Sequence, residues 1–332
     1  MAEAIGSNPI QCGFESHPGH HFGQCQWSPR GWRLSLACFV AREDHDAMRA
    51  AEPSRTAKLA AMSRGQHRRR HAPPWVLDDQ LAFSLAGPGW EELYDAVVPL
   101  FPEPVLDGIV AWQVTRARYA EERLSTADFA QYVILGAGLD SFAWRRPDAL
   151  ERGLTVYEID HPATQAWKQE RAEALALPHS EHHVFAPVDF ETQTLREGLD
   201  AIGFDWTART LFSWLGVVPY LTDDAIRATL ETVVDAAPGS QIVVHYAIDD
   251  ALRDDLGRTY FQTMTGIAAQ SGEPLITFWR PDEAEAVVAD CGLKVVDHPS
   301  RDDLIERYFA GRDDGLAPIQ AEAILTAEVP AR

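Results

Sequence analysis

The sequence predicts an α/β protein built on a seven-stranded sheet with helices on both faces. The first observation is that short apolar, β-branched segments alternate with helix-like segments from residue 126 onward. This alternation is typical of parallel strands joined by crossover helices, so we expect a parallel sheet. The second is a glycine-containing turn directly after the first strand, and the third is an aspartate at the end of the second strand. The expected strands lie at 132–135, 154–160, 183–188, 210–215, 241–247, 293–296 and 323–329.

A helical section precedes the first strand. Ser54 is a typical N-cap and is followed by strong helix formers up to residue 70, where the pair Pro73-Pro74 ends the pattern. A short helix is expected within 76–85 and a longer one at 105–124. Residues 53–125 are therefore expected to form a helical cap section in front of the strand-containing core at 126–330.

Helices are also expected between the strands. Thr222 can cap one of them, and the two acidic residues that follow it favour the positive end of a helix dipole. A helical insert near 250–280 interrupts the alternation after the fifth strand. The expected helices of the core are 162–177, 191–203, 222–237, 250–271 and 281–291.

Residues 1–52 differ from the rest of the chain. They have no sustained helical or strand periodicity and contain three of the four cysteines, Cys12, Cys25 and Cys38, beside several histidines. Thiolate and imidazole groups are zinc ligands, but the segment has no C-x2-C pair. We therefore expect a loosely ordered or peripheral extension and no metal site.

The overall charge limits the partners. The chain has 29 Lys+Arg against 50 Asp+Glu, a formal net charge of −21, which would repel a phosphate backbone. No apolar run approaches the ~18 residues of a membrane-spanning helix. We expect a cytoplasmic protein that binds neither nucleic acid nor membrane. The sequence does not decide whether it forms a homo-oligomer.

The turn after the first strand has the features of a nucleoside site. Gly136 and Gly138 would let a ligand approach the backbone closely at the carboxyl end of the sheet. Asp160 follows Gly138 by 22 residues, where a carboxylate can accept both hydroxyl groups of a ribose. Ser141 stands where the dinucleotide motif has its third glycine, so a nucleoside without pyrophosphate fits better than NAD.

Several segments together resemble the leucine carboxyl methyltransferase family. They are SRTA at 54–57, VILGAGLDSFAWR at 133–145, VYEIDHP at 156–162, PVDF at 187–190 and LFSWLGVVPYLT at 211–222. The resemblance covers about residues 54–330. It implies a Rossmann-like class I methyltransferase fold, S-adenosylmethionine (SAM) as cofactor and methyl transfer to an acceptor. Bacterial members of the family include O-methyltransferases of polyketide and other natural-product pathways.

The resemblance also implies roles for individual residues. Asp160 would bind the ribose hydroxyl groups, and Gly136 and Gly138 would lie beside the methionine portion of SAM. Arg116 would bind the SAM carboxylate, a role that fits its bidentate guanidinium, although Arg118 competes for it by register. The other cofactor-binding positions are Asp189 and Phe190 at the adenine, and Trp214. A helix N-cap is the alternative role for Asp189.

Two positions depart from the family pattern. The family often has Trp-Glu-Gly after the fourth strand, whereas this chain has Leu215 between Trp214 and Gly216, so one acidic cofactor contact is expected to be absent. The fifth strand commonly ends Phe-Asp-Tyr, and here His245 replaces the acid. His245 is either a general base with a pKa near neutrality or a buried, hydrogen-bonded histidine.

The expected activity is SAM-dependent O-methylation of a carboxyl or hydroxyl group on a small-molecule acceptor, a polyketide-like or other secondary metabolite. Tyr220, Tyr246 and Trp279 are the candidate residues for binding this acceptor. The alternatives are carboxyl methylation of a peptide or protein C-terminus, an NAD(P)-dependent oxidoreductase, and a degenerate module that binds SAM without catalysis.

Overall fold

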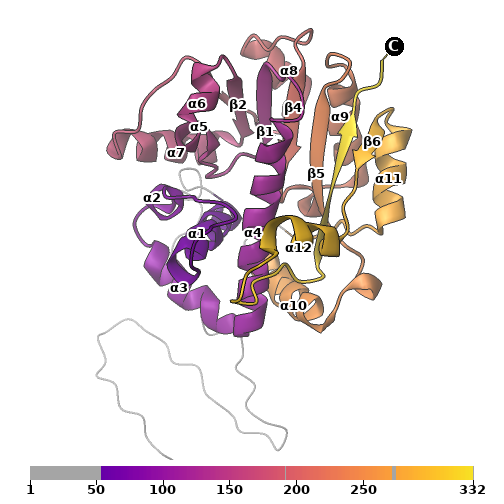
Figure 1. Ribbon diagram of the computed structural model, residues 1–332. Helices are drawn as coiled ribbons and strands as arrows, with labels where there is room; N and C mark the ends of the chain where they lie inside the picture. The colour runs from indigo at the N-terminus through magenta and orange to yellow at the C-terminus, as the bar shows by residue number, and fades with distance from the viewer. Residues whose placement is uncertain (1–53, 191, 271–273, 332) are drawn as a thin grey trace, which may run out of the picture. The chain divides into compact units, whose positions relative to one another are not determined.

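A seven-stranded sheet with the order β3-β2-β1-β4-β5-β7-β6 forms the centre of the computed structural model (Figure 1). The structure describes residues 54–190, 192–270 and 274–331, so the expected extension at 1–52 and its cysteines lie outside the described residues. Each strand end lies within one residue of its expected position. The strands are β1 (Gln131–Leu135), β2 (Thr155–Asp160), β3 (His183–Pro187), β4 (Thr210–Trp214), β5 (Gln241–Ala247), β6 (Lys294–Asp297) and β7 (Glu322–Glu328).

The sheet is mixed rather than fully parallel. Strands β1 to β5 pair in parallel, but β7 runs antiparallel to both β5 and β6. The expectation of a parallel sheet is therefore wrong for this strand. The reason is the connection from β6, in which α12 (Arg301–Phe309) stays at the carboxyl end of the sheet instead of crossing back along a face (Figure 1). The chain then enters β7 beside the end of β5, where the Ile248 amide donates to the Ala321 carbonyl at 3.1 Å.

Helices cover both faces of the sheet. On one face α8, α9 and α11 pack against the side chains that include Leu135, Ile159 and Val244, and on the other α4 packs against the set that includes Ile134 and Val243. No helix in the described part of the chain is long and apolar enough to cross a membrane. The α-helices are α1 (Arg55–Arg70), α2 (Ala82–Ala86), α3 (Trp90–Val97), α4 (Glu103–Arg123), α5 (Phe142–Arg145), α6 (Pro147–Glu151), α7 (Pro162–Ala174), α8 (Leu195–Ala201), α9 (Asp223–Val234), α10 (Asp255–Gln270), α11 (Pro281–Asp290) and α12, and short 3-10 turns lie at Val98–Leu100 (η2), Val218–Tyr220 (η3) and Asp250–Leu252 (η4).

Three helix starts lie more than two residues from the expected ones, and one of them is α10, which begins at Asp255 after the 3-10 turn at Asp250–Leu252. The helix expected at 191–203 begins at Leu195, because Thr194 and Glu197 form a reciprocal capping box there. The short helix expected within 76–85 begins only at Ala82. The sequence pattern did not predict α3, α5, α6 or α12, which are all short.

A buried arginine fixes the helical cap section to the turn after β1. Arg64 of α1 binds Asp79 at 2.9 Å and donates a second hydrogen bond to the carbonyl of Leu139 at 2.6 Å. The start of α1 consequently lies against the turn, since a Cβ atom placed on Gly138 would be 3.2 Å from the Cβ of Ala57. The cap section therefore closes one side of the region where the nucleoside site was predicted.

Candidate active site

The turn after β1 requires glycine at two positions. Gly136 and Gly138 have φ angles of 66° and 51°, a region that residues with a side chain rarely adopt. A Cβ atom on Gly136 would also lie 2.4 Å from Val217. The amide groups of Gly136 and Ala137 donate to the carbonyl of Ile159 in β2, which holds the turn close to the end of that strand.

Asp160 ends β2 with its carboxylate held over this turn. One oxygen accepts from the Gly138 amide at 2.6 Å and the other from the His161 amide at 2.7 Å. Burial raises the pKa of Asp160, and the two amide hydrogen bonds oppose that shift. Because a carboxylate has about four acceptor sites, it can still accept from two ligand hydroxyl groups.

Asp189 and Phe190 follow β3, the strand next to Asp160. The Phe190 side chain is 54% exposed, which is unusual for a large apolar residue and leaves a ring face available to a planar ligand. Asp189 is not the N-cap of α8, because Thr194 has that role. Its backbone carbonyl instead accepts hydrogen bonds from the next turn of chain, at Thr192 and Gln193.

Arg116 extends from α4 to the carboxyl end of β4. A Cβ atom on Gly216 would lie 2.6 Å from its Nη1 atom, so the guanidinium covers this glycine just after Trp214, the buried last residue of β4. Arg118 is exposed, so the register of α4 brings Arg116 and not Arg118 to the sheet. Burial lowers the pKa of Arg116, and the charge of Glu322 opposes that shift. Within the described residues no group forms a hydrogen bond with the Arg116 guanidinium.

His245 is fully buried in β5. Its Nε2 atom lies 3.2 Å from Glu322 and its ring meets Trp112 edge to face, with 5.7 Å between centroids. Burial lowers the pKa of His245 despite the carboxylate, so the ring is neutral near pH 7. An ionised carboxylate can only accept, and Nε2 therefore carries the proton. Nδ1 is left as a buried acceptor without a partner among the described residues.

One acidic member of this cluster was not predicted as a site residue. Glu322 is the first residue of β7, and its second oxygen accepts from the Tyr260 hydroxyl of α10 at 3.3 Å. The only sequence signal for Glu322 is an acid at the start of an apolar strand. Its place beside His245 depends on β7 pairing with β5, which the sequence did not specify.

The predicted acceptor-binding residues are divided between the two faces of the sheet. Tyr220 is half-buried at the end of η3, just beyond β4, and interacts electrostatically with Arg116. Tyr246 and Trp279 are buried in the core beneath α11, with 5.6 Å between their ring centroids. The Tyr246 hydroxyl forms a hydrogen bond with His298. The structure therefore brings Tyr220 to the Arg116 cluster and places the other two in the opposite core. Their part in acceptor binding stays a prediction.

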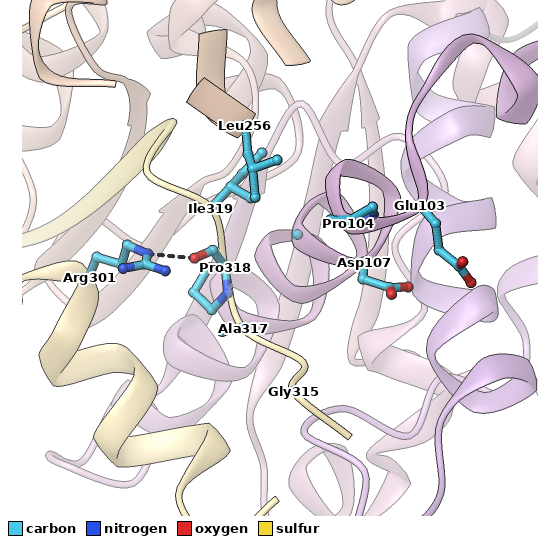
Figure 2. Close-up of a pocket in the computed structure, with 10 residues that line it drawn as sticks. Glu103, Pro104, Asp107, Leu256, Arg301, Gly315, Ala317, Pro318 and Ile319 are labelled. Atoms are coloured by element: carbon cyan, nitrogen blue, oxygen red, sulfur yellow. Dashed lines mark hydrogen bonds between the residues drawn. The ribbon is translucent and has the colours of Figure 1, made fainter. Parts of the chain in front are cut away.

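A surface groove of about 390 Å³ lies between the start of α4, α10 and the segment before β7 (Figure 2). It contains none of the predicted site residues. Figure 2 shows Arg301 bonded to the Pro318 carbonyl, which fixes this segment beside the groove. The neighbouring Ile319 carbonyl accepts from Trp112 at 2.7 Å and so holds that ring against His245.

Comparison with known proteins decides the family. The family model described as leucine carboxyl methyltransferase matches residues 57–234, more than half of the chain. The chain belongs to the leucine carboxyl methyltransferase family. A Bacillus subtilis (strain 168) protein named "Putative S-adenosyl-L-methionine-dependent methyltransferase YktD" is 32% identical, over 82% of this chain and 97% of the relative. A Mycobacteroides abscessus protein named "Putative S-adenosyl-L-methionine-dependent methyltransferase" is 30% identical, over 85% of this chain and 90% of the relative.

A solved methyltransferase structure has the same fold as this chain. A crystal structure titled as a putative methyltransferase from Thermobifida fusca YX matches with a TM-score of 0.58 and 17% identity, over 84% of this chain and 96% of that one. The similarity at this identity concerns the fold, which is that of the class I methyltransferases. Family and fold together make the chain a SAM-dependent methyltransferase, and the dinucleotide-dependent alternative is not supported.

Proposed function

We propose that this member of the family transfers the methyl group of SAM to an oxygen atom, carboxyl or hydroxyl, of a small secondary metabolite such as a polyketide. The observation that carries the proposal is the placement of two groups at the carboxyl edge of the sheet. The carboxylate of Asp160 is fixed over the glycine turn, and the guanidinium of Arg116 lies over Gly216 without a hydrogen bond from the described residues. These two groups match the ribose diol and the α-carboxylate, which lie on opposite sides of the sulfur in SAM.

The remaining cofactor contacts fit the same orientation. Gly136 and Gly138 allow the methionine portion to approach the backbone because neither position has a side chain. The exposed Phe190 ring offers a face to the adenine, and Asp189 offers oxygen atoms to its edge. Every one of these residues follows β1, β2 or β3 at the same edge of the sheet, which is where ligands of open α/β sheets bind.

When bound, SAM supplies a methyl group that is already activated by its sulfonium. The task of the protein is therefore to align an acceptor oxygen with that methyl group and to exclude water, an effect that can contribute about 7–11 kcal/mol. A carboxylate acceptor is ionised at pH 7 and needs no base, whereas a phenol, with an ordinary pKa of ~10, gains from one.

The Glu322–His245 pair supports a hydroxyl acceptor. Glu322 holds the Nε2 proton of His245, and Nδ1 is left with a lone pair that can accept a proton. The carboxylate orients the imidazole and stabilises the charge that the ring gains on protonation. The family description favours the second candidate, methylation of a carboxyl group at the end of a peptide or protein.

Methyl-labelled SAM distinguishes these candidates. The protein is incubated with phenolic polyketides, small carboxylic acids and a peptide with a free C-terminal carboxyl, and the products are then treated with mild base. Base releases the label from a methyl ester but not from a methyl ether. We expect label on a small molecule, and label on the peptide alone would refute the proposal.

Two substitutions of His245 test its role once an acceptor is known. For a hydroxyl acceptor, His245→Ala and His245→Asn should both lower kcat by about 10²–10⁴-fold, because neither side chain can act as a base near pH 7. For a carboxylate acceptor, His245→Asn should retain most of the activity. Wild-type rates in both variants would show that His245 is a structural residue.

A further inference from the structure

The acid that the family places after β4 has a counterpart elsewhere in this chain. Position 215 is a leucine here, so the turn after β4 brings no carboxylate to Arg116. Strand order places β4, β5 and β7 side by side, and Glu322 is the first residue of β7, opposite Ala247 at the end of β5. Trp214 at the end of β4 pairs with Val244, three residues before Ala247, so Glu322 lies two strands across from β4 and further toward the carboxyl edge of the sheet.

Arg116 and Glu322 interact electrostatically without forming an ion pair. Each lies within the electrostatic reach of the other, yet no ion pair shorter than 4 Å joins these two described residues. Glu322 is only 7% exposed, and the hydrogen bonds from His245 and Tyr260 hold both of its oxygens in place. Each oxygen retains acceptor capacity, because a carboxylate has about four acceptor sites in total.

A cation and an anion held apart in this way are complementary to the amino-acid end of SAM. Bond lengths place an α-amino nitrogen about 2.5 Å from its carboxylate carbon, with opposite charges on the two groups. We propose that Glu322 binds the α-ammonium group of SAM while Arg116 binds the α-carboxylate. Glu322 thereby replaces, from β7, the acid that Leu215 removes from the turn after β4. The inference rests on the proposed cofactor site and adds one residue to it.

The cluster around Glu322 explains how its charge is retained in a buried position. Burial acts to raise the pKa of Glu322, but the hydrogen bond from His245 and the charge of Arg116 lower it overall. His245 and Tyr260 also fix the rotamer of the carboxylate, so both are positioning residues in this assignment. The same hydrogen bonds would exist if Glu322 only supported His245, and an experiment must separate the two roles.

Calorimetric titrations with two ligands distinguish a role of Glu322 in SAM binding from a role in supporting His245 alone. S-adenosylhomocysteine has the amino-acid end, whereas 5′-deoxy-5′-methylthioadenosine has the nucleoside and the sulfur but no amino acid. Glu322→Gln keeps the size and shape of the side chain and one acceptor oxygen, replaces the other oxygen by an amide donor, and removes the charge. We expect this variant to bind S-adenosylhomocysteine about 10- to 100-fold more weakly and methylthioadenosine as tightly as the wild type does. Glu328→Gln, at the other end of β7 and bonded to Gln241, is the matched control and should bind both ligands normally.

The outcomes distinguish this inference from the cofactor site itself. Unchanged affinity of Glu322→Gln for S-adenosylhomocysteine, with a selective loss in Arg116→Gln, would overturn the role of Glu322 alone. An equal loss for both ligands would also overturn it, because the effect would then not concern the amino-acid end. A wild-type protein that binds neither ligand would contradict the cofactor site. If Glu322→Gln does not fold, deaminated S-adenosylhomocysteine tests the wild type, which should bind it 10- to 100-fold more weakly, and equal binding would refute the inference.

Discussion

Replacing Gly216 by alanine should separate cofactor binding from stability. Gly216 has a φ of 73°, and a Cβ atom there would lie 2.6 Å from Nη1 of Arg116. Gly203 has the same φ of 73° but has nothing within 4 Å of its Cβ position. Both substitutions introduce the same backbone strain, about 1–2 kcal/mol, and only Gly216→Ala displaces the guanidinium.

The two variants should therefore have similar stabilities and different affinities. The end of a flexible arginine side chain can move at little energetic cost, so the strain alone should lower Tm by a few degrees in both proteins. Losing one charge-assisted hydrogen bond to the ligand carboxylate, about 1.5–3 kcal/mol, should weaken S-adenosylhomocysteine binding by about 10- to 100-fold in Gly216→Ala only. Thermal melts and calorimetric titrations measure the two effects. Equal affinities of Gly216→Ala and Gly203→Ala would refute the placement of Arg116 at the cofactor.

Three further predictions concern other residues. Asp160→Ala should weaken S-adenosylhomocysteine binding by about 10²–10⁴-fold in a titration, because two hydrogen bonds to a charged group are lost, while Asp148→Ala on the surface should have no effect. Lys168→Met leaves the buried carboxylate of Glu158 without its ammonium partner and should lower the free energy of unfolding in urea by about 3–5 kcal/mol. Adding Glu158→Gln should recover part of this loss, and no recovery would contradict the pairing argument. Burial lowers the pKa of His67 from 6.5 to about 4, so the free energy of unfolding should fall by up to about 3 kcal/mol as the pH falls from 6.5 to 4. His67→Gln should remove this pH dependence.

The sequence predicted the strands and the nucleoside half of the site because both depend on short-range patterns. Buried strands are continuous apolar runs, and their ends are readily located. Gly136, Gly138 and Asp160 belong to two neighbouring strands, so parallel pairing brings them together wherever that pattern occurs. Neither the strand positions nor the grouping of these three residues depends on contacts between distant parts of the sequence.

The amino-acid half of the site depends on packing that the sequence does not specify. Whether Arg116 or Arg118 faces the sheet is decided by the orientation of α4 on β1 and β4. Glu322 reaches His245 only because β7 enters between β5 and β6 in the antiparallel direction. The burial of His245 likewise depends on Trp112, which the distant Ile319 carbonyl holds in place.

The most direct test of the central claim is a calorimetric titration of the wild-type protein with S-adenosylhomocysteine, with NAD titrated in parallel. The carboxylate of Asp160 and the guanidinium of Arg116 predict saturable binding of S-adenosylhomocysteine at one site per chain and no binding of NAD. A folded protein that binds NAD, or that binds neither ligand, would contradict the assignment of the carboxyl edge of the sheet as a SAM site.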